Sequence, residues 1–126
     1  MKARSFEIDG RRVGSTEPPY VIAELSANHN GSIERARKSI VSAKQCGAHA
    51  VKLQTYTADT MTLDVDQPEF KIEGGPWHGF GLYELYEWAH TPFGWHEELF
   101  QLAKEVGITV FSTPFDDTAL DLLESL

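Results

Sequence analysis

The stretch YVIAELSANHNGSIERARKSIVSAKQCGAHAVKLQT, residues 20–55, decides the fold. It opens with an apolar run, Tyr20–Ala23, which predicts a buried strand. Polar turn residues at Asn30–Ser32 then favour the start of a helix, and Gly47 is typical of a helix end. A second strand is expected over residues 49–55. A strand, a helix and a strand within about 35 residues match the size of a parallel βαβ crossover.

The sequence before this stretch predicts a separate small element. Residues 5–14 alternate in character around Asp9-Gly10, and an Asp-Gly pair between short β-like runs favours a tight hairpin turn. We therefore expect residues 1–18 to form an N-terminal β-hairpin and lead-in. Residues 19–126 would then hold the strands and helices of the main fold.

The sequence after residue 55 continues the alternation of strands and helices. Residues 56–82 are irregular and too long for an ordinary connection. A helix is expected over residues 82–89, and Thr91 and Pro92 suggest an N-cap and first helical position for the next one, which ends at Gly107. The last expected elements are a strand over residues 108–111 and a helix from about Asp116 to the end of the chain.

A hairpin followed by the order β-α-β-α-β-α predicts an α/β fold whose parallel sheet is covered by helices. Three parallel strands cannot close a barrel, and a complete (β/α)₈ barrel needs about 250 residues. We therefore expect these 126 residues to be the N-terminal part of a (β/α)₈ TIM barrel preceded by a β-hairpin. The rest of such a barrel would lie outside this chain.

Composition excludes several classes of function. The chain has 11 Lys plus Arg against 19 Asp plus Glu, a formal net charge of −8, which argues against a general nucleic-acid binder. Its single cysteine, Cys46, cannot form an intrachain disulfide. The sequence contains neither a run of 18 apolar residues nor an N-terminal signal-peptide pattern. We expect a soluble, cytoplasmic protein with neither nucleic acid nor membrane as a partner.

Polar residues follow each apolar strand, at the edge where parallel α/β folds gather their reactive groups. Glu24 ends the first strand, Lys52 lies within the second, and Ser112 follows the third. A buried ammonium is costly without an anion, so Lys52 should pair either with Glu24 or with a ligand anion such as phosphate. Glu24 itself could bind a sugar hydroxyl, transfer a proton or neutralise Lys52. The residues alone leave these alternatives open.

Three segments carry a resemblance to a known family: AELSANHNG at residues 23–31, GAHAVKLQTYTADT at residues 47–60 and FSTPFD at residues 111–116. In this order and spacing they resemble the sialic acid synthase family, whose members condense phosphoenolpyruvate with an N-acetylated sugar aldehyde. Glu-Leu-Ser-Ala-Asn-His, in place of the Glu-Ile-Gly of neuraminate synthases, resembles the branch that forms pseudaminic acid. That branch implies a 6-deoxy diacetamido hexose of the altrose type as the sugar, with release of phosphate.

The resemblance also implies roles for individual residues. Lys52 and Glu24 would be catalytic, with Lys52 on the phosphate or carboxylate of phosphoenolpyruvate and Glu24 facing the sugar aldehyde and its hydroxyls. The residues expected to bind substrate are Lys52, Gln54, Thr55, Ser112, Asn28 and His29. Of these, Asn28 or His29 would lie in a loop on the sugar side, although Asn28-His29-Asn30-Gly31 could equally be a plain turn before the helix.

Family members use a divalent metal ion, Mn²⁺ or Mg²⁺, held by histidines that would lie outside this chain. A likeness to the family therefore implies no metal ligand within these residues, a homodimer for the complete enzyme and an inactive isolated chain. N-acetylneuraminate or legionaminate synthase is the alternative within the enzyme class. A non-catalytic sugar- or phosphate-binding module that keeps the family's first strands is the alternative outside it.

Overall fold

The computed structural model describes residues 5–126, and its main sheet has three parallel strands in the order β3-β4-β5. These are β3 (Ile22–Glu24), β4 (Ala50–Thr55) and β5 (Thr109–Pro114). In the register, Lys52 lies between Glu24 on β3 and Phe111 on β5. The predicted α/β class with a parallel sheet is confirmed.

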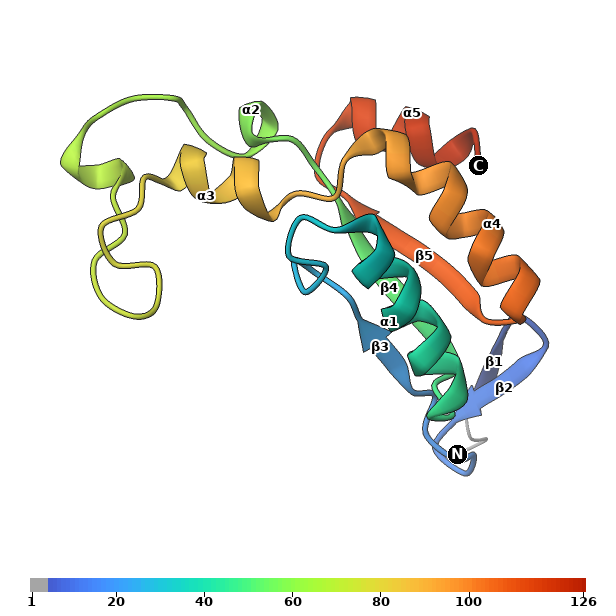
Figure 1. Ribbon diagram of the computed structural model, residues 1–126. Coiled ribbons are helices and arrows are strands. Elements are labelled where there is room, and N and C mark those ends of the chain that lie inside the picture. Colours follow the sequence, from blue (N-terminus) through green and yellow to red (C-terminus); the bar gives the residue numbers. More distant parts are fainter. Residues whose placement is uncertain (1–4) are drawn as a thin grey trace.

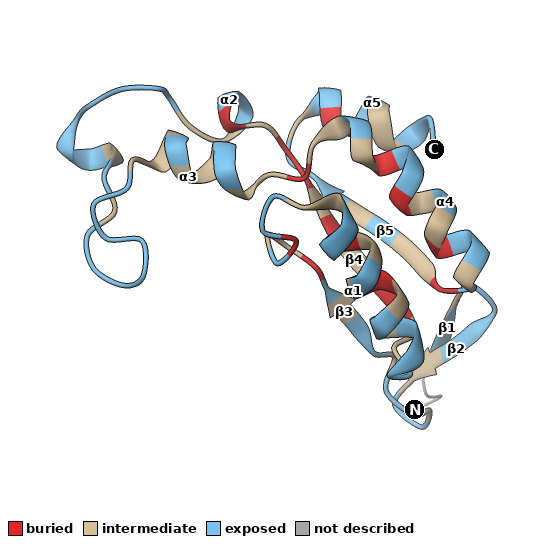
Figure 2. Cartoon of the chain, in the orientation of Figure 1, coloured by how far each residue is buried: buried red, intermediate tan, exposed pale blue. Residues whose placement is uncertain are grey.

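Two helices cover one face of this sheet, as Figure 1 shows: α1 (Ile33–Gln45) between β3 and β4, and α4 (His96–Val106) before β5. Their apolar faces meet the sheet in a core whose largest fully buried aliphatic side chains are Ile40, Leu53 and Leu99. Figure 2 places the buried residues along β4 and the inner faces of α1 and α4. No helix within residues 5–126 is long and apolar enough to cross a membrane.

Helix α1 begins and ends where the sequence indicated. The hydroxyl of Ser32 accepts a hydrogen bond from the backbone N–H of Arg35 and so satisfies one of the free donors of the first turn. Ala36 and Ile40 are fully buried on its inner face. Gly47 has a φ of 86°, the left-handed conformation that only glycine adopts without strain.

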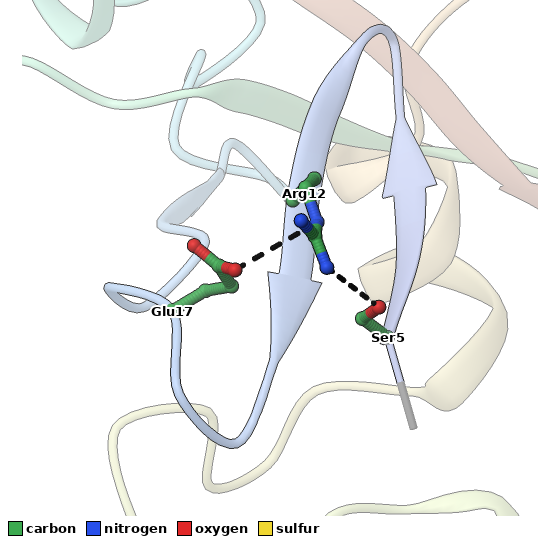
Figure 3. A network of polar contacts seen from close by, with 3 residues as sticks. All are labelled: Ser5, Arg12 and Glu17. Carbon is green, nitrogen blue, oxygen red and sulfur yellow. Dashed lines mark hydrogen bonds and ion pairs between the residues drawn. The ribbon is translucent and has the colours of Figure 1, made fainter. Parts of the chain in front are cut away.

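The N-terminal hairpin pairs β1 (Ser5–Ile8) with β2 (Arg11–Gly14), antiparallel, around the predicted turn. Arg12 links the hairpin to the segment after it, because its guanidinium donates to Ser5 Oγ at 3.2 Å and lies 3.7 Å from Glu17 (Figure 3). Thr109 Oγ1 donates to Asp9 Oδ2 at 2.7 Å, which places the hairpin at the start of β5. The hairpin therefore lies at the amino ends of the strands. Residues 1–4 of the predicted lead-in lie outside the described residues.

The long irregular stretch after β4 extends away from the sheet at the carboxyl ends of the strands (Figure 1). It contains α2 (Ala58–Met61), the 3₁₀ turn η1 (Pro68–Phe70) and α3 (Leu82–Ala89). The rings of Trp77 and Trp88 pack against each other within it, with their centroids 5.1 Å apart. At the other end of the chain, α5 (Asp117–Glu124) begins close to the predicted position, and Asp116 is its N-cap.

Two predictions of local structure were wrong. The helix expected to begin at Thr91 and Pro92 starts later, with the 3₁₀ turn η2 (Phe93–Trp95) followed by α4, because Pro92 has an extended ψ of 135°. The strand predicted to be buried, Tyr20–Ala23, is partly open, with Val21 50% and Ile22 44% exposed. The reason is that β3 is an edge strand, and among residues 5–126 no element covers the sheet face opposite the helices.

Candidate active site

The two faces of β4 divide the candidate residues into two groups. Successive side chains of a strand point to opposite faces, and Val51, Leu53 and Thr55 are buried on the helix side. Lys52 and Gln54 therefore point to the open face, where both are only half-buried. The open face, at the carboxyl ends of the strands, is the candidate site.

Lys52 and Glu24 form an ion pair at the centre of this open face. Lys52 Nζ lies 2.7 Å from Glu24 Oε2, and the side chains are 33% and 38% exposed. The first of the two alternatives for Lys52 is thus realised, since the pair exists. An ammonium has three donor hydrogens, however, and one contact with Glu24 leaves others for a ligand anion. The pair and anion binding are therefore compatible.

Gln54 and Thr113 extend the site beside this pair. They are register neighbours on β4 and β5, so their side chains point to the same face. Gln54 Oε1 accepts a hydrogen bond from Ser26 Oγ at 3.2 Å. Thr113 was not among the residues predicted from the sequence, which included its neighbour Ser112 instead. Strand alternation identifies Thr113 only once the register between β4 and β5 is known, and the structure supplies that register.

Thr55 and Ser112, which were expected to bind substrate, lie on the opposite face of the sheet. Thr55 is fully buried, and its Oγ1 lies 2.6 Å from Ser112 Oγ and 2.8 Å from His96 Nε2 on α4. A one-residue step along a strand reverses the face, and this separates both hydroxyls from Lys52 and Gln54. The expectation that Thr55 and Ser112 bind substrate together with Lys52 and Gln54 is therefore corrected. Both hydroxyls lie on the helix side of the sheet, behind the site.

The ring of His96 determines which groups donate and which accept in this buried chain of hydrogen bonds. Its Nδ1 lies 3.2 Å from the carbonyl oxygens of both Pro92 and Phe93, which can only accept, so Nδ1 carries the proton. Nε2 must then accept from the hydroxyl of Thr55, and Thr55 in turn accepts from Ser112. Burial lowers the pKa of His96 and keeps the ring neutral. The chain joins the ends of β4 and β5 to the first turn of α4.

Thr55→Val is expected to destabilise the protein by about 1–3 kcal/mol, because an isosteric methyl leaves buried His96 Nε2 and the Ser112 hydroxyl without their partner. Urea unfolding measures the loss. Thr55→Ser keeps the hydroxyl and serves as the control, with a smaller loss than that of Thr55→Val. Equal stability of Thr55→Val and wild type would contradict the hydrogen-bond chain.

The loop after β3 holds the other two predicted residues in different environments. His29 is fully buried, its Nδ1 accepts from the backbone N–H of Gly31 at 3.1 Å, and its ring packs edge-on against Trp95 at 5.4 Å. His29 Nε2 therefore donates, over a long 3.4 Å, to the hydroxyl of Thr91. Asn28 is exposed in the same loop. His29 thus anchors the loop, while Asn28 is free to reach a ligand.

The two buried histidines are expected to make stability depend on pH. Desolvation lowers the pKa of His29 and of His96, and the charge of nearby His90 lowers that of His29 further. The unfolded chain then binds more protons below its histidine pKa of about 6.5, so stability is constant above that pH and falls as the pH decreases through it. Urea unfolding between pH 8 and 5.5 tests this. The slope should shrink in His96→Gln, and a stability that is unchanged over this range would refute the assignment.

Among residues 5–126, no group of three or more His, Cys, Asp or Glu side chains lies close enough to hold a metal ion. Among the strand residues that the structure describes, the open face carries one carboxylate, Glu24, and it is already paired with Lys52. These residues do not fit a metal centre by themselves.

The fold and the site together define a parallel α/β protein with a charged site at the carboxyl ends of its strands, the arrangement that α/β enzymes use. The chain belongs to the NeuB family, which it matches over residues 39–126. It is 51% identical over 105 residues to the pseudaminic acid synthase of Campylobacter jejuni, covering 83% of this chain and 31% of that protein.

One further relative and one solved structure also resemble the chain. It is 36% identical over 114 residues to the N,N'-diacetyllegionaminic acid synthase of Legionella pneumophila, covering 90% of this chain and 32% of that protein. The structure of an N-acetylneuraminic acid synthetase from Leptospira borgpetersenii superposes with a TM-score of 0.76 at 23% identity, covering 98% of this chain and 38% of that one. That likeness shows the fold. The chain spans about a third of the length of the curated relatives it matches.

Proposed function

We propose that this chain is the N-terminal part of a (β/α)₈ synthase that condenses phosphoenolpyruvate with a 6-deoxy diacetamido hexose of the altrose type. The products are pseudaminic acid and phosphate. The observation that carries the proposal is the 51% identity to a pseudaminic acid synthase, against 36% to a legionaminic acid synthase, over similar lengths of this chain.

The open face of the sheet supports this proposal through its chemistry. Lys52 supplies a cation for the phosphate or carboxylate of phosphoenolpyruvate, and Gln54 and Thr113 supply neutral hydrogen-bonding groups beside it. Glu24 already neutralises the charge of Lys52. Phosphoenolpyruvate carries several negative charges, so the other cations that bind it would come from the part of the complete protein outside this chain. Holding the anion in line is positioning and electrostatic work.

In the proposed reaction, C3 of phosphoenolpyruvate attacks the aldehyde carbon of the sugar and forms the new C–C bond. The aldehyde oxygen takes up a proton and becomes a hydroxyl, positive charge develops at C2, and water adds there with loss of one proton. The bond between C2 and the phosphate oxygen then breaks, the new C2 hydroxyl loses its proton to give the ketone, and phosphate leaves. The Glu24 carboxylate can accept a hydrogen bond from a sugar hydroxyl or a proton from the added water. Lys52 would hold the anion. Asn28, exposed in the loop after β3, would contact the sugar.

The remaining features of the proposal concern the complete protein, meaning this chain continued to the length of its relatives. A divalent ion, Mn²⁺ or Mg²⁺, would supply Lewis-acid chemistry from ligands outside these residues. The complete protein would be a cytoplasmic homodimer, and the isolated 126 residues would be inactive.

Phosphate release from phosphoenolpyruvate by the complete protein tests the proposal. The 6-deoxy-altrose diacetamido sugar and N-acetylmannosamine are offered in parallel with Mn²⁺ or Mg²⁺, and an EDTA reaction tests the metal requirement. Release with the first sugar alone is expected. Release with N-acetylmannosamine alone would support the neuraminate alternative instead, and a gluco-configured diacetamido sugar tests the legionaminate one.

No release with any sugar, from a folded complete protein, would overturn the synthase proposal. The non-catalytic binding module is the function that would then remain. In that case Lys52→Ala and Glu24→Ala would still weaken the binding of phosphoenolpyruvate or sugar, measured by calorimetry, without any turnover to lose.

A further inference from the structure

Ser26 lies in a backbone conformation that its side chain does not favour. Its φ is 47°, in the left-handed region where glycine, asparagine and aspartate are common and serine is not. It follows β3 by two residues, next to the site. Strained residues at such a position persist when something else in the structure requires them.

The hydroxyl of Ser26 has one contact that glycine could not make. Its Oγ donates to Gln54 Oε1 at 3.2 Å, across from the loop to β4 and partly shielded from solvent. The bond occupies the carbonyl end of the Gln54 amide. The hydrogen bonds described for residues 5–126 leave both Nε2 hydrogens of Gln54 free, on the face that carries Lys52.

A side-chain amide can rotate by about 180°, which exchanges its carbonyl oxygen, an acceptor, with its NH₂ group, a donor. Without Ser26, Gln54 could present either its carbonyl oxygen or its N–H groups to the open face. In the orientation that the structure has, Oε1 accepts from Ser26 and the N–H groups are presented to the open face. These donors suit an oxygen acceptor beside the Lys52 ammonium, such as a carboxylate, phosphate or acetamido oxygen.

We propose that Ser26 is a positioning residue that orients the Gln54 amide so that its N–H groups bind an acceptor oxygen of a substrate. This inference rests on the proposed function, and it adds Ser26 as a residue that acts on the substrate through Gln54. Two substrates could supply the oxygen: phosphoenolpyruvate through its carboxylate or phosphate, or the sugar through its acetamido group. The KM of each, measured separately, distinguishes them.

Ser26→Gly in the complete protein is the central variant, because glycine accepts the same φ and removes only the hydroxyl. We expect the KM of one substrate to rise roughly three- to tenfold, as loss of one hydrogen bond implies, with kcat changed less than about threefold. The Tm should not fall, because the backbone strain is relieved. Asn30→Gly is the matched control, since Asn30 has a φ of 49° in the same loop and is exposed. It should leave both kinetic constants unchanged.

A double-mutant cycle shows whether Ser26 acts through Gln54. In the Gln54→Ala background, Ser26→Gly should have no further effect on KM. An unchanged KM in the Ser26→Gly single variant, or an effect of equal size in both backgrounds, would overturn the inference. A lower Tm with kcat and KM both impaired would indicate a structural role instead, and would also overturn it.

The side-chain amide NMR signals of Gln54 separate this inference from the proposed function. If the wild-type protein releases no phosphate with any sugar, the synthase proposal fails, but the amide orientation can still be read. A single sharp pair of Gln54 N–H signals in wild type, shifted or broadened in Ser26→Gly, supports the positioning role. Identical signals in the two proteins would refute it.

Discussion

Lys52→Met in the complete protein is expected to lower kcat/KM for phosphoenolpyruvate by roughly 10²- to 10³-fold. Lys52 is the only cation on the open sheet face within the described residues, and it lies at the centre of that face between Glu24 and Phe111. Removing one well-placed group that stabilises charge in the transition state typically costs this much. Steady-state phosphate release at varied phosphoenolpyruvate measures the loss.

The matched control is Lys38→Met, which removes the same charge from an exposed position on α1, away from the open face. Its kcat/KM should stay within about twofold of wild type. The stability of Lys52→Met should fall only modestly, because Glu24 is itself 38% exposed and water can solvate it once the pair is broken. A Lys52→Met protein that is folded and fully active would exclude Lys52 from the site.

Leu53→Ala is expected to destabilise the protein by about 2–5 kcal/mol. Leu53 is fully buried on the central strand, where it contacts the core formed with Ile40 on α1 and Leu99 on α4. Truncation loses the burial of its side chain and leaves a cavity between the sheet and both helices. Urea unfolding monitored by circular dichroism measures the change in free energy of unfolding.

Leu120→Ala makes the same chemical change at a position on α5 that is 43% exposed, and should cost less than about 1 kcal/mol. Comparable losses at the two positions would mean that Leu53 does not lie in the core described here. Leu53 points to the helix side of the sheet, whereas its neighbours Lys52 and Gln54 point to the open face.

The parallel sheet and its helices could be predicted from the sequence because each signal is local. Ser32 and Gly47 bound α1, Asp9-Gly10 fixes the hairpin turn, and apolar runs mark β4 and β5. The start of α4 was missed for a tertiary reason. Thr91 is buried against His29, so the cap that its sequence position suggested is used to hold the loop after β3.

The candidate site was predicted in part. Residue type and position along an apolar strand were enough to select Glu24 and Lys52, and the family resemblance added Gln54. The structure brings the three side chains together on one face. The same reasoning could not decide whether Thr113 or Ser112 lies on the face of Lys52. Both residues are polar, they point to opposite faces, and the register between β4 and β5 is not visible in one sequence. The role of His96 depends on a contact with Thr55 that is remote in the chain, and no local pattern marks it.

A crystal structure of the complete protein with phosphoenolpyruvate tests most directly whether the open face is the substrate site. We expect the phosphate or carboxylate within hydrogen-bond distance of Lys52 Nζ, with Gln54 Nε2 and Thr113 beside it and the chain of Ser112, Thr55 and His96 unchanged on the far side of the sheet. Phosphoenolpyruvate bound instead through Ser112 and Thr55, or at a place remote from Lys52, would contradict the assignment.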